Sequence, residues 1–479
     1  MKSLLLFSLS ASLAFAGLPS VGPDYHRPDV TSPDAYRDAE YAGPWKVATP
    51  SDELARGEWW RLFSDSVLDE LQRRALAGNL DLQAAAARVE QAAAAAGIAR
   101  SAYWPQIAAD PSLVREQTSR TTDNTLPNTR TTTYRAPLVA SWELDLFGRV
   151  RRLSESARAE AGAAFAVFES LRLALTSEVA ANYFSLRAAD REREIVEQNI
   201  ALRRRALELV QSRRTSGTGS DLDVARAEAE LASTQAELSA VSRQHEALHN
   251  ALAVLTGEAA STFVLPAREA TPAIPRVPVG LPSDLLERRP DVAAAERALM
   301  AANARIGVAK AAFFPAISLT GSAGYASGDI DSLFRSDSRA WSIGPSLYLP
   351  IFQGGRNRAN LARSRAAYEE SVAQFRQRVL VAFREVQDAL TAARLLDDER
   401  AAQERASTSA RRAVQLATRR YDAGYVSFLE VLDAQRTALA AERATAQLEA
   451  QRLNASVALL KALGGGWHAE HLGQAVARN

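Results

Sequence analysis

The sequence of 479 residues contains no cysteine. This absence excludes disulfides, thiolate metal sites, cysteine nucleophiles and lipid attached through a cysteine. An excess of one charge is also missing, since 57 Lys and Arg stand against 56 Asp and Glu, for a net charge of +1. This balance argues against nucleic acid as a partner, because nucleic-acid-binding proteins normally have a basic excess on one face.

Motifs of enzymes and cofactor sites are scarce as well. The sequence has no glycine-rich phosphate loop, no G-x-S-x-G elbow and no EF-hand loop. Two short basic clusters, Arg203-Arg204-Arg205 and Arg213-Arg214, stand among acidic residues and are expected on solvated helix surfaces. The sequence therefore predicts a protein that is not an enzyme and has no cofactor and no metal site.

Long apolar runs are missing except at the start of the chain. Lys2 precedes the run from Leu4 to Phe15, and Ala14-Phe15-Ala16 has the small residues of a cleavage site. This pattern predicts a secretory signal peptide over residues 1–16 and an exported protein. A transmembrane helix needs about 20 apolar residues, and no later segment qualifies. Any entry into a membrane would therefore depend on strands.

Proline is missing from two long regions, 138–265 and 351–479. Both are rich in the strong helix formers Ala, Leu, Glu, Gln and Arg. We expect in each region a helix of about 65 residues, a tight reversal and a return helix of about 40 residues. The longer helix would span roughly 100 Å, and the return helices have an apolar seam with the alternating three- and four-residue spacing of a coiled coil.

The two reversals have the same motif, with Gly217 in "RRTSGTGSDLDVARAE" (213–228) and Gly424 in "RRYDAGYVSFLEVLDAQ" (419–435). Aligning the two glycines also aligns four later positions: Ser220 with Ser427, Leu222 with Leu429, Asp223 with Glu430, and Val224 with Val431. The chain is therefore expected to contain two copies of one helical hairpin.

A second repeated block lies ahead of each hairpin. "AGIARSAYWPQI" (96–107) matches "IGVAKAAFFPAI" (306–317), so that Trp104-Pro105 aligns with Phe314-Pro315. These four residues are predicted helix-to-strand junctions, because the apolar periodicity changes to two after each proline. We expect strands at about 106–118, 131–147, 316–327 and 340–352, each with one apolar and one polar face.

Four strands are too few to close a barrel. In lipid, an open sheet edge leaves backbone groups without hydrogen bonds, at several kcal/mol each. If these strands lie in a membrane, several chains must therefore combine them, and the sequence predicts an oligomer.

Two other functions compete with this interpretation. "HEALH" (245–249) has the H-E-x-x-H spacing of a zinc peptidase, although Glu258 or Glu269 would have to serve as the third ligand; the alternative is an incidental histidine pair. The chain could also be a periplasmic coiled-coil scaffold whose alternating segments are soluble hairpins. Metal analysis, a peptidase assay and extraction without detergent distinguish these functions from a channel.

Several long segments resemble the TolC-like outer membrane factor family, in particular the branch that serves RND multidrug pumps. They are "LPSDLLERRPDVAAAERALMAANARIGVAKAAFFPAISLTGSAGY" (281–325), "VGPDYHRP" (21–28), "WWRLFSDSVLDEL" (59–71) and "IFQGGRNRANLARSRAAYEESVAQF" (351–375). The resemblance extends from Val21 to Leu463. It implies an α+β membrane protein with two tandem repeats of helix, strand pair and long helical hairpin.

The resemblance also implies a homotrimer, whose twelve strands form one β-barrel in the outer membrane of a Gram-negative bacterium. An α-helical barrel continues it through the periplasm. The implied function is a passive exit duct for drugs and other small molecules, and the implied partners are a periplasmic adaptor (membrane fusion) protein, an inner-membrane RND pump and outer-membrane lipid. A duct for type I-like secretion is the alternative.

The implied domains follow the repeats. They are a signal peptide (1–16), an N-terminal equatorial segment (17–64), a first repeat (65–257) with its tip turn at 217, an equatorial linker (258–281), a second repeat (282–463) with its tip turn at 424, and a C-terminal equatorial tail (464–479).

Site residues follow from the family positions. The implied periplasmic aperture or gate consists of Asp433, Glu430, Leu429, Tyr421 and Asp223. The adaptor is expected to contact two tip turns, Gly217, Thr218, Gly219 and Ser220 in the first and Gly424, Tyr425, Val426 and Ser427 in the second. The chain departs from the family at two places: Leu18-Pro19-Ser20 stands where many relatives have a lipid-bearing cysteine, and Val426 stands where an arginine can occur.

Overall fold

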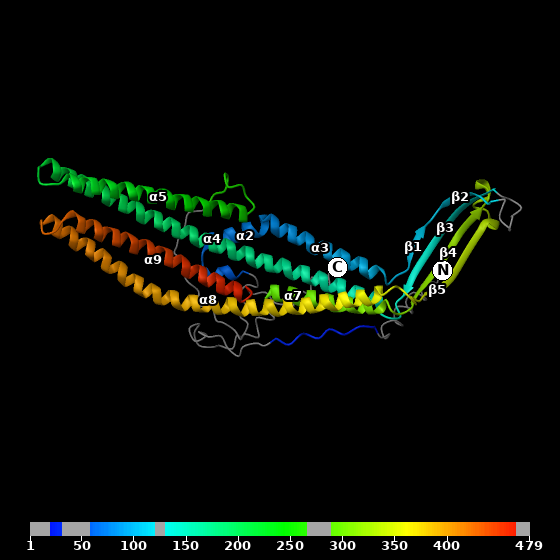
Figure 1. Cartoon of the computed structure of the whole chain (residues 1–479). Coiled ribbons are helices and arrows are strands. Elements are labelled where there is room, and N and C mark those ends of the chain that lie inside the picture. The colour runs from blue at the N-terminus through cyan, green and yellow to red at the C-terminus, as the bar shows by residue number, and fades with distance from the viewer. Residues whose placement is uncertain (1–19, 31–57, 120–129, 266–288, 466–479) are drawn as a thin grey trace.

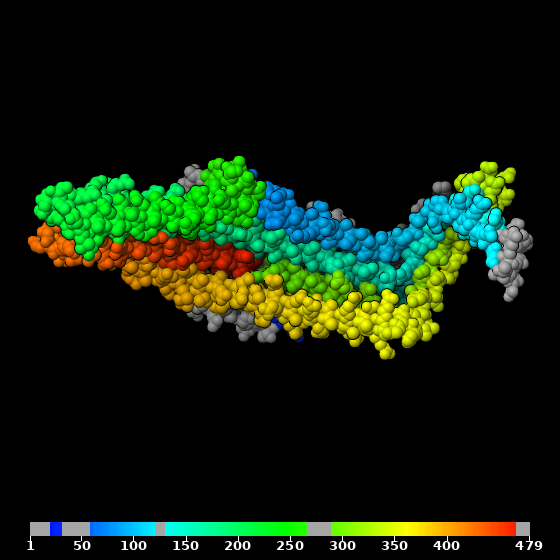
Figure 2. All heavy atoms as spheres, turned by 45° about the horizontal axis from the view of Figure 1, so that its top comes forward, coloured from blue at the N-terminus to red at the C-terminus, as the bar shows by residue number. Residues whose placement is uncertain are grey.

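A computed structural model describes residues 20–30, 58–119, 130–265 and 289–465. Long helices lie side by side in an elongated rod, and a sheet extends from one end of the rod at an angle (Figure 1). The space-filling view shows the bend between the helical and the sheet parts (Figure 2). Within these four ranges, no helix is both long and apolar enough to cross a membrane.

The chain consists of two repeats with matching elements. The first contains α3 (Leu80–Ser101), β1 (Gln106–Ala109), β2 (Ser112–Gln117), β3 (Arg130–Leu144), α4 (Arg149–Thr215) and α5 (Asp221–Leu255). The second contains α7 (Pro290–Ala311), β4 (Ala316–Ser327), β5 (Arg339–Tyr348), α8 (Arg356–Asp422) and α9 (Phe428–Ala462). Corresponding helices have equal lengths: 22 residues in α3 and α7, 67 in α4 and α8, and 35 in α5 and α9.

The strands differ from their expected bounds at three places, two of which lie at a proline. β3 ends at Leu144 rather than at 147. The segment expected as one strand at 106–118 forms β1 and β2, separated by Asp110 and Pro111. Both pair with β3 in one continuous register. The last strand ends at Tyr348, ahead of Pro350, rather than at 352. Because proline has no backbone N–H to donate, it interrupts a ladder without shifting the register.

The sheet is antiparallel, with β3 and β4 in its middle. β1 and β2 pair with β3, β3 pairs with β4, and β4 pairs with β5. None of the residues of these five strands is buried. Both faces of the sheet are therefore uncovered in the single chain.

Close aromatic and polar contacts hold the junction between sheet and helices. The ring of Phe147 stacks on that of Phe314, with centroids 4.9 Å apart. The Asp145 carboxylate accepts hydrogen bonds from the backbone N–H groups of Val150 and Arg151, at 3.0 and 2.9 Å. This carboxylate satisfies free donors in the first turn of α4 and fixes the direction in which the helix leaves the sheet.

The main hydrophobic core lies around the middle of α4. A short 3-10 helix, η2 (Trp59–Phe63), and α2 (Ser66–Gly78) pack there against α4 and the C-terminal ends of α5 and α9. The Tyr183 hydroxyl donates to the Asp65 carboxylate at 2.7 Å, and burial raises the pKa of Tyr183 to about 12. This core fixes the positions from which both hairpins extend away from the sheet.

Candidate functional site

The site predicted from the sequence lies at the far end of the two hairpins. The α4–α5 reversal has Gly217 at φ 78°. The Thr218 N–H donates to the Arg213 carbonyl at 3.0 Å, and the Gly217 N–H donates to the Arg214 carbonyl at 3.1 Å. These two hydrogen bonds define a Schellman motif, in which a glycine in the left-handed region ends a helix.

The α8–α9 reversal has the same backbone geometry. Gly424 also has φ 78°, the Tyr425 N–H donates to the Arg420 carbonyl at 2.8 Å, and the Gly424 N–H donates to the Tyr421 carbonyl at 2.9 Å. A Cβ at Gly217 or Gly424 would meet no atom within 4 Å. The positive φ, rather than lack of space, therefore accounts for glycine at both positions.

The side chains of the two turns differ. The Ser220 hydroxyl accepts a hydrogen bond from the Leu222 N–H at 3.1 Å and caps α5, whereas Ser427 makes no side-chain cap on α9. A Cβ at Gly219 would lie 2.7 Å from the Arg214 backbone nitrogen. Val426 occupies the matching position in the second turn, so the first turn folds more closely onto its helix than the second can.

The expected aperture residues lie on the first turns of the return helices and at the end of α8. Glu430, Asp433 and Leu429 are all exposed, and the exposed fraction of Leu429 is 46%. Tyr421 is half-buried, and its ring packs on that of Phe428 with centroids 5.4 Å apart. Asp223 lies 3.8 Å from Arg226 in its own helix.

Sequence reasoning missed one contact between the tips. The Arg213 guanidinium lies over the Tyr421 ring, 4.3 Å from its centroid, and 3.8 Å from the Asp422 carboxylate. Arg213 was expected on a solvated surface, but it joins the end of α4 to the end of α8. The cluster at 213–214 gave no signal of this contact, because its partners lie in the other repeat.

An apolar cluster lies directly behind the tips and contains residues of both hairpins. It is formed by Val210, Ala227, Phe428, Val431 and Leu432. Phe428 is 2% exposed and Val431 is 3% exposed. The two hairpins therefore share a core close to their reversals.

An ion triad, in which two of the three side chains are buried, lies farther along the rod. The Glu230 carboxylate of α5 pairs with Arg203 of α4 and Arg436 of α9, and the Nε of Arg436 lies 2.7 Å from Oε1 of Glu230. The side chains of Arg203 and Glu230 are 6% and 10% exposed. The hydrogen bond from Arg436, with the charge of Arg203, lowers the pKa of Glu230. The prediction that the cluster at 203–205 is solvated is therefore wrong for Arg203.

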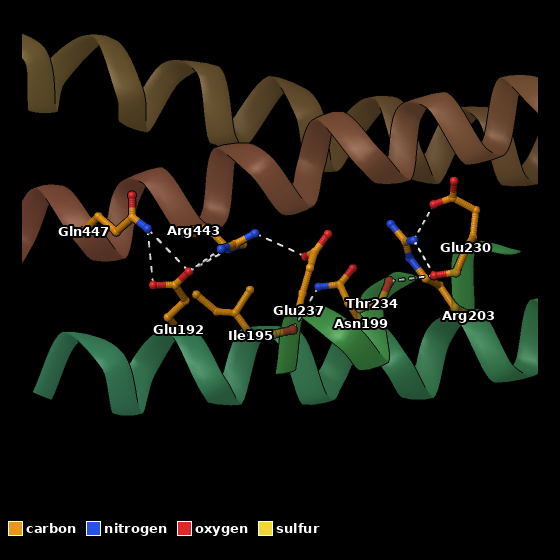
Figure 3. A network of polar contacts seen from close by, with 9 residues as sticks. All are labelled: Glu192, Ile195, Asn199, Arg203, Glu230, Thr234, Glu237, Arg443 and Gln447. Atoms are coloured by element: carbon orange, nitrogen blue, oxygen red, sulfur yellow. Dashed lines mark hydrogen bonds and ion pairs between the residues drawn. The ribbon is translucent and has the colours of Figure 1, made fainter. Parts of the chain in front are cut away.

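A second polar group joins the same three helices farther from the tips (Figure 3). The Nε of Arg443 donates to Glu192 of α4 at 2.7 Å, and its Nη1 lies 3.1 Å from Glu237 of α5. The side-chain amide of Gln447 also donates to Glu192, at 3.2 Å. Arg436 and Arg443 of α9 are seven residues apart, which is one heptad, and so are Glu230 and Glu237 of α5. Ion pairs therefore join α9 to α5 at two positions one heptad apart.

The HEALH segment forms part of the packing between α4 and α5. Nε2 of His245 lies 3.0 Å from the Asp190 carboxylate, and the His249 ring packs edge-on against Phe263 at 4.9 Å. The candidate ligand Glu258 accepts a hydrogen bond from Arg74 at 2.7 Å, while Glu269 lies outside the described residues. Within the described part of the chain, no three His, Cys, Asp or Glu side chains form a group that could hold a metal ion.

The helix-to-strand junction residues lie where α3 and α7 give way to the sheet. Trp104 and Pro105 stand between α3 and β1, and Phe314 and Pro315 stand between α7 and β4. Trp104 is 54% exposed, whereas Phe314 packs on Phe147. Equivalent positions in the two repeats thus have different surroundings.

Comparison with known proteins agrees with this geometry. Residues 71–258 and 281–465 match the model of the family described as "Outer membrane efflux protein". The chain is 36% identical over 473 residues to the solvent efflux pump outer membrane protein SrpC of Pseudomonas putida, covering 97% of this chain and 98% of that protein. It is 33% identical over 467 residues to the cation efflux system protein CusC of Escherichia coli, covering 96% and 98%.

A solved structure has the same fold. The outer-membrane channel OprN superposes with a TM-score of 0.86 at 35% identity, covering 93% of this chain and 99% of that chain. The family model matches each of the two repeats separately, in agreement with the equal lengths of their corresponding helices. The chain belongs to the outer membrane efflux protein family, whose members are channels and not enzymes.

Proposed function

We propose that three copies of the chain form a passive exit duct, which receives small molecules from an RND-type pump through a periplasmic adaptor. The duct performs no chemistry, and the pump supplies the energy. The observation that carries this proposal is the pair of open edges on the chain. β1 and β2 form one edge of the sheet and β5 forms the other, and each edge needs a partner in lipid.

The helical part has open edges on the same two sides. α4 packs extensively against α3, α5, α7 and α9, whereas the extensive packing of α8 among the described helices is with α7 and α9. α3 leads into β1, and β5 leads into α8, so the edges of sheet and helices continue each other. The sheet is four strands wide, and two copies would give eight strands, whose interior side chains fill. Three copies give twelve and leave a passage.

The cargo is less constrained than the duct. The names of SrpC and CusC refer to solvent efflux and cation efflux. The two proteins have nearly equal sequence identity to this chain, 36% and 33%. Sequence similarity therefore does not select one cargo. We propose drugs and other small molecules, for which a wide polar passage discriminates by size and charge rather than by shape.

We propose that Glu430 and Asp433 encircle the periplasmic aperture, with Leu429 as an apolar ring beside them. Three copies of each acid around one axis repel each other and attract cations. Opening then requires the tip helices to move outward together, and the contact of Arg213 with Tyr421 joins the two hairpins of each chain at this end. Asp223 occupies the matching place on the first hairpin.

The adaptor would meet the two tip turns at residues 217–220 and 424–427. Tyr425 is 78% exposed and Leu222 is 56% exposed, so each tip offers an apolar side chain to a partner. We also assign residues 17–64, 258–281 and 464–479 to an equatorial belt. The packing of Trp59, Phe63 and Phe263 on the middle of α4 supports this assignment for the described parts.

Extraction in mild detergent, followed by mass determination and planar-bilayer recording, tests this function. The protein should require detergent, have three times the protein mass of one mature chain and form conducting pores. A monomer that is extracted without detergent and forms no pores would contradict the proposal and favour the coiled-coil scaffold.

A further inference from the structure

The two hairpins of one chain are joined at several levels between the main core and the tips. Nearest the core, the Asn454 side-chain amide of α9 donates to the Ser185 hydroxyl of α4 at 3.1 Å. The ion pairs of Glu192 and Glu230 with arginines of α9 follow (Figure 3). The shared apolar cluster lies behind the tips, and Arg213 joins the two hairpins at the tips themselves. Polar, ionic and apolar contacts thus make one unit of the two hairpins.

α8 belongs to the same unit through its contacts with α9. The Gln403 side-chain amide donates to the Ala441 carbonyl at 2.9 Å, and Nε of Arg411 lies 3.1 Å from Oε1 of Glu442. Ser407 and Ala410, which are buried, lie on this side of α8 as well. The opposite side of α8 is uncovered in the single chain.

The uncovered side of α8 near the tips is basic. Arg405, Arg412 and Arg419 are spaced by seven residues and therefore lie on one face, and all three are exposed. Within the described residues, none of these guanidinium groups has an ion-pair or hydrogen-bond partner. Ser409 and Leu416 stand between them on the same face, and Leu416 is 50% exposed. Long, charged side chains thus project from a helix face that lacks a partner.

The uncovered side of α5 has small side chains instead. The buried residues Ala227, Glu230 and Thr234 lie on the side that faces the rest of the chain. Four exposed alanines at spacings of four and three residues lie on the opposite side and form what we call the alanine stripe: Ala225, Ala229, Ala232 and Ala236. α5 contains six acids and two arginines, whereas residues 400–422 of α8 contain six arginines and two acids. The two faces are therefore complementary in both side-chain size and charge.

The two faces lie on the two open edges of the chain. α5 runs along one edge of the rod and α8 along the other (Figure 1). The Asn79 side-chain amide donates to the Leu255 carbonyl at 3.1 Å, so α5 continues toward the tips the edge that α3 forms near the sheet. The edges of α5 and α8 are thus continuous with the sheet edges that the proposed duct joins.

Contacts with α4 show which positions of α5 and α8 have equal height. Arg213 of α4 lies 3.8 Å from Asp422 at the end of α8, and Arg203 of α4 pairs with Glu230 of α5. Arg412 precedes Asp422 by ten residues, as Arg203 precedes Arg213, so Arg412 is about level with Glu230 because helices rise equally per residue. Rotation about the duct axis keeps these heights in every copy. The pairs expected to meet between copies are Arg412 with Ala229 and Arg405 with Ala236.

We infer that the tips open by movement between copies rather than between the two hairpins of one chain. In the resting duct, α8 of one copy lies antiparallel to α5 of the next, with Arg405, Arg412 and Arg419 over the alanine stripe. This seam consists mainly of arginines and alanines, and exposed ion pairs contribute little. The contacts inside a chain include the buried Phe428, so the seam separates first. This inference rests on the proposed duct and assigns the surface at which it opens.

The absence of cysteine makes this movement testable in the full-length protein. Arg412→Cys combined with Ala229→Cys places two thiols across the seam. The matched control, Glu237→Cys combined with Arg443→Cys, places two thiols between α5 and α9 of one chain. A short bis-methanethiosulfonate reagent bridges each pair through two mixed disulfides, with release of methanesulfinate, and a thiol reductant removes the bridge.

Bridging across the seam should give covalent multimers on a denaturing gel and should abolish full openings in planar-bilayer recordings. The reductant should restore both the single-chain mass and the openings. Bridging the control pair should leave the chain at its single-chain mass and should not reduce the openings. Arg405→Cys combined with Ala236→Cys is a second seam pair and should behave as the first does.

Three results would overturn the inference. One is the absence of multimers in both seam pairs after mass spectrometry has verified that all four thiols react. Another is the persistence of full openings in the bridged multimers. The third is loss of openings in the bridged control pair, which would place the movement between the hairpins of one chain. Failure of the unsubstituted protein to form any channel would instead refute the proposed duct.

Discussion

The two hairpin tips have one backbone design and two kinds of side-chain contact. The same Schellman geometry occurs at Gly217 and Gly424. Across the first turn, Arg214 and Asp221 form an exposed ion pair, with 3.1 Å between Nη2 and Oδ2. The matching positions in the second turn are Tyr421 and Phe428, whose rings pack together. The repeat has therefore kept the turn, while the contacts across it have diverged.

The difference indicates unequal mechanical roles. Phe428 belongs to the apolar cluster that the hairpins share, so the second tip is anchored in a core. The contact across the first tip faces solvent, where an ion pair contributes little and is screened by salt. We expect the second tip to be the more rigid of the two in a resting channel.

The long helices α4 and α8 differ in the same way. Both have 67 residues, but buried positions extend from Val150 to Val210 in α4 and only from Val372 to Ala410 in α8. Equal repeats thus produce one central and one peripheral helix in a single chain. A neighbouring copy along α8 would make the two environments more alike, in line with the proposed trimer.

The largest expected effect comes from removing the acid that joins the hairpins. Glu230→Ala leaves the buried guanidinium of Arg203 without its carboxylate, and loss of one partner from a buried pair costs about 3–5 kcal/mol. The free energy of unfolding should fall, and hydrogen exchange should increase in α4, α5 and α9 together. Glu228→Ala, an exposed acid in the same helix, is the control, and equal effects of both substitutions would contradict the role of the triad.

Low pH should weaken the ion pairs that Glu230 makes with Arg203 and Arg436. Because its arginine partners lower the pKa of Glu230 in the folded state, the carboxylate contributes stability that is fully present above its unfolded value, near 4.5. That contribution is lost as the pH falls through the lowered folded pKa. The destabilising effect of Glu230→Ala should therefore be constant from pH 7 to pH 6 and should shrink below about pH 4, as measured by denaturant unfolding.

The next effect separates the two tips. Phe428→Ala creates a cavity in the shared cluster, and truncation of a buried phenylalanine costs about 3–5 kcal/mol. Hydrogen exchange should rise most at the α8–α9 reversal and less at the α4–α5 reversal. Leu429→Ala, next to it but exposed, is a control for stability. Equal loosening of both tips by Phe428→Ala would contradict the unequal anchoring.

Removal of the acidic residues near the tips should affect conductance differently in the two hairpins. Glu430→Ala combined with Asp433→Ala should raise the single-channel conductance and lower the cation preference by about twofold, because repulsive charges and their bound cations leave the aperture. Asp223→Ala should change both quantities less, since Asp223 already lies near Arg226. Planar-bilayer recording measures both, and an unchanged conductance in the double variant would place these acids away from the constriction.

The sequence alone was sufficient to predict local structure where a single residue determines the backbone conformation. Only glycine adopts the positive φ of Gly217 and Gly424 without strain, and two-residue alternation predicted the two faces of β4. Contacts between the repeats could not be predicted in this way. Arg203 looks like a surface arginine because its partner Glu230 lies on another helix. Glu230 in turn binds Arg436 of the other repeat, and helix periodicity does not say which distant helix covers a face.

The smallest expected effect concerns the ion pair across the first tip. Asp221→Asn removes the charge partner of Arg214, and that arginine lowers the pKa of Asp221 in the intact protein. Both side chains are exposed to solvent, so overall stability should not change measurably, and only hydrogen exchange at residues 216–222 should increase slightly at low salt. In 1 M salt the variant and the unsubstituted protein should exchange alike, because screening already removes the attraction. A difference that persists at high salt would show that the first tip depends on more than this ion pair, and the contrast between an ionic and an apolar tip would then fail.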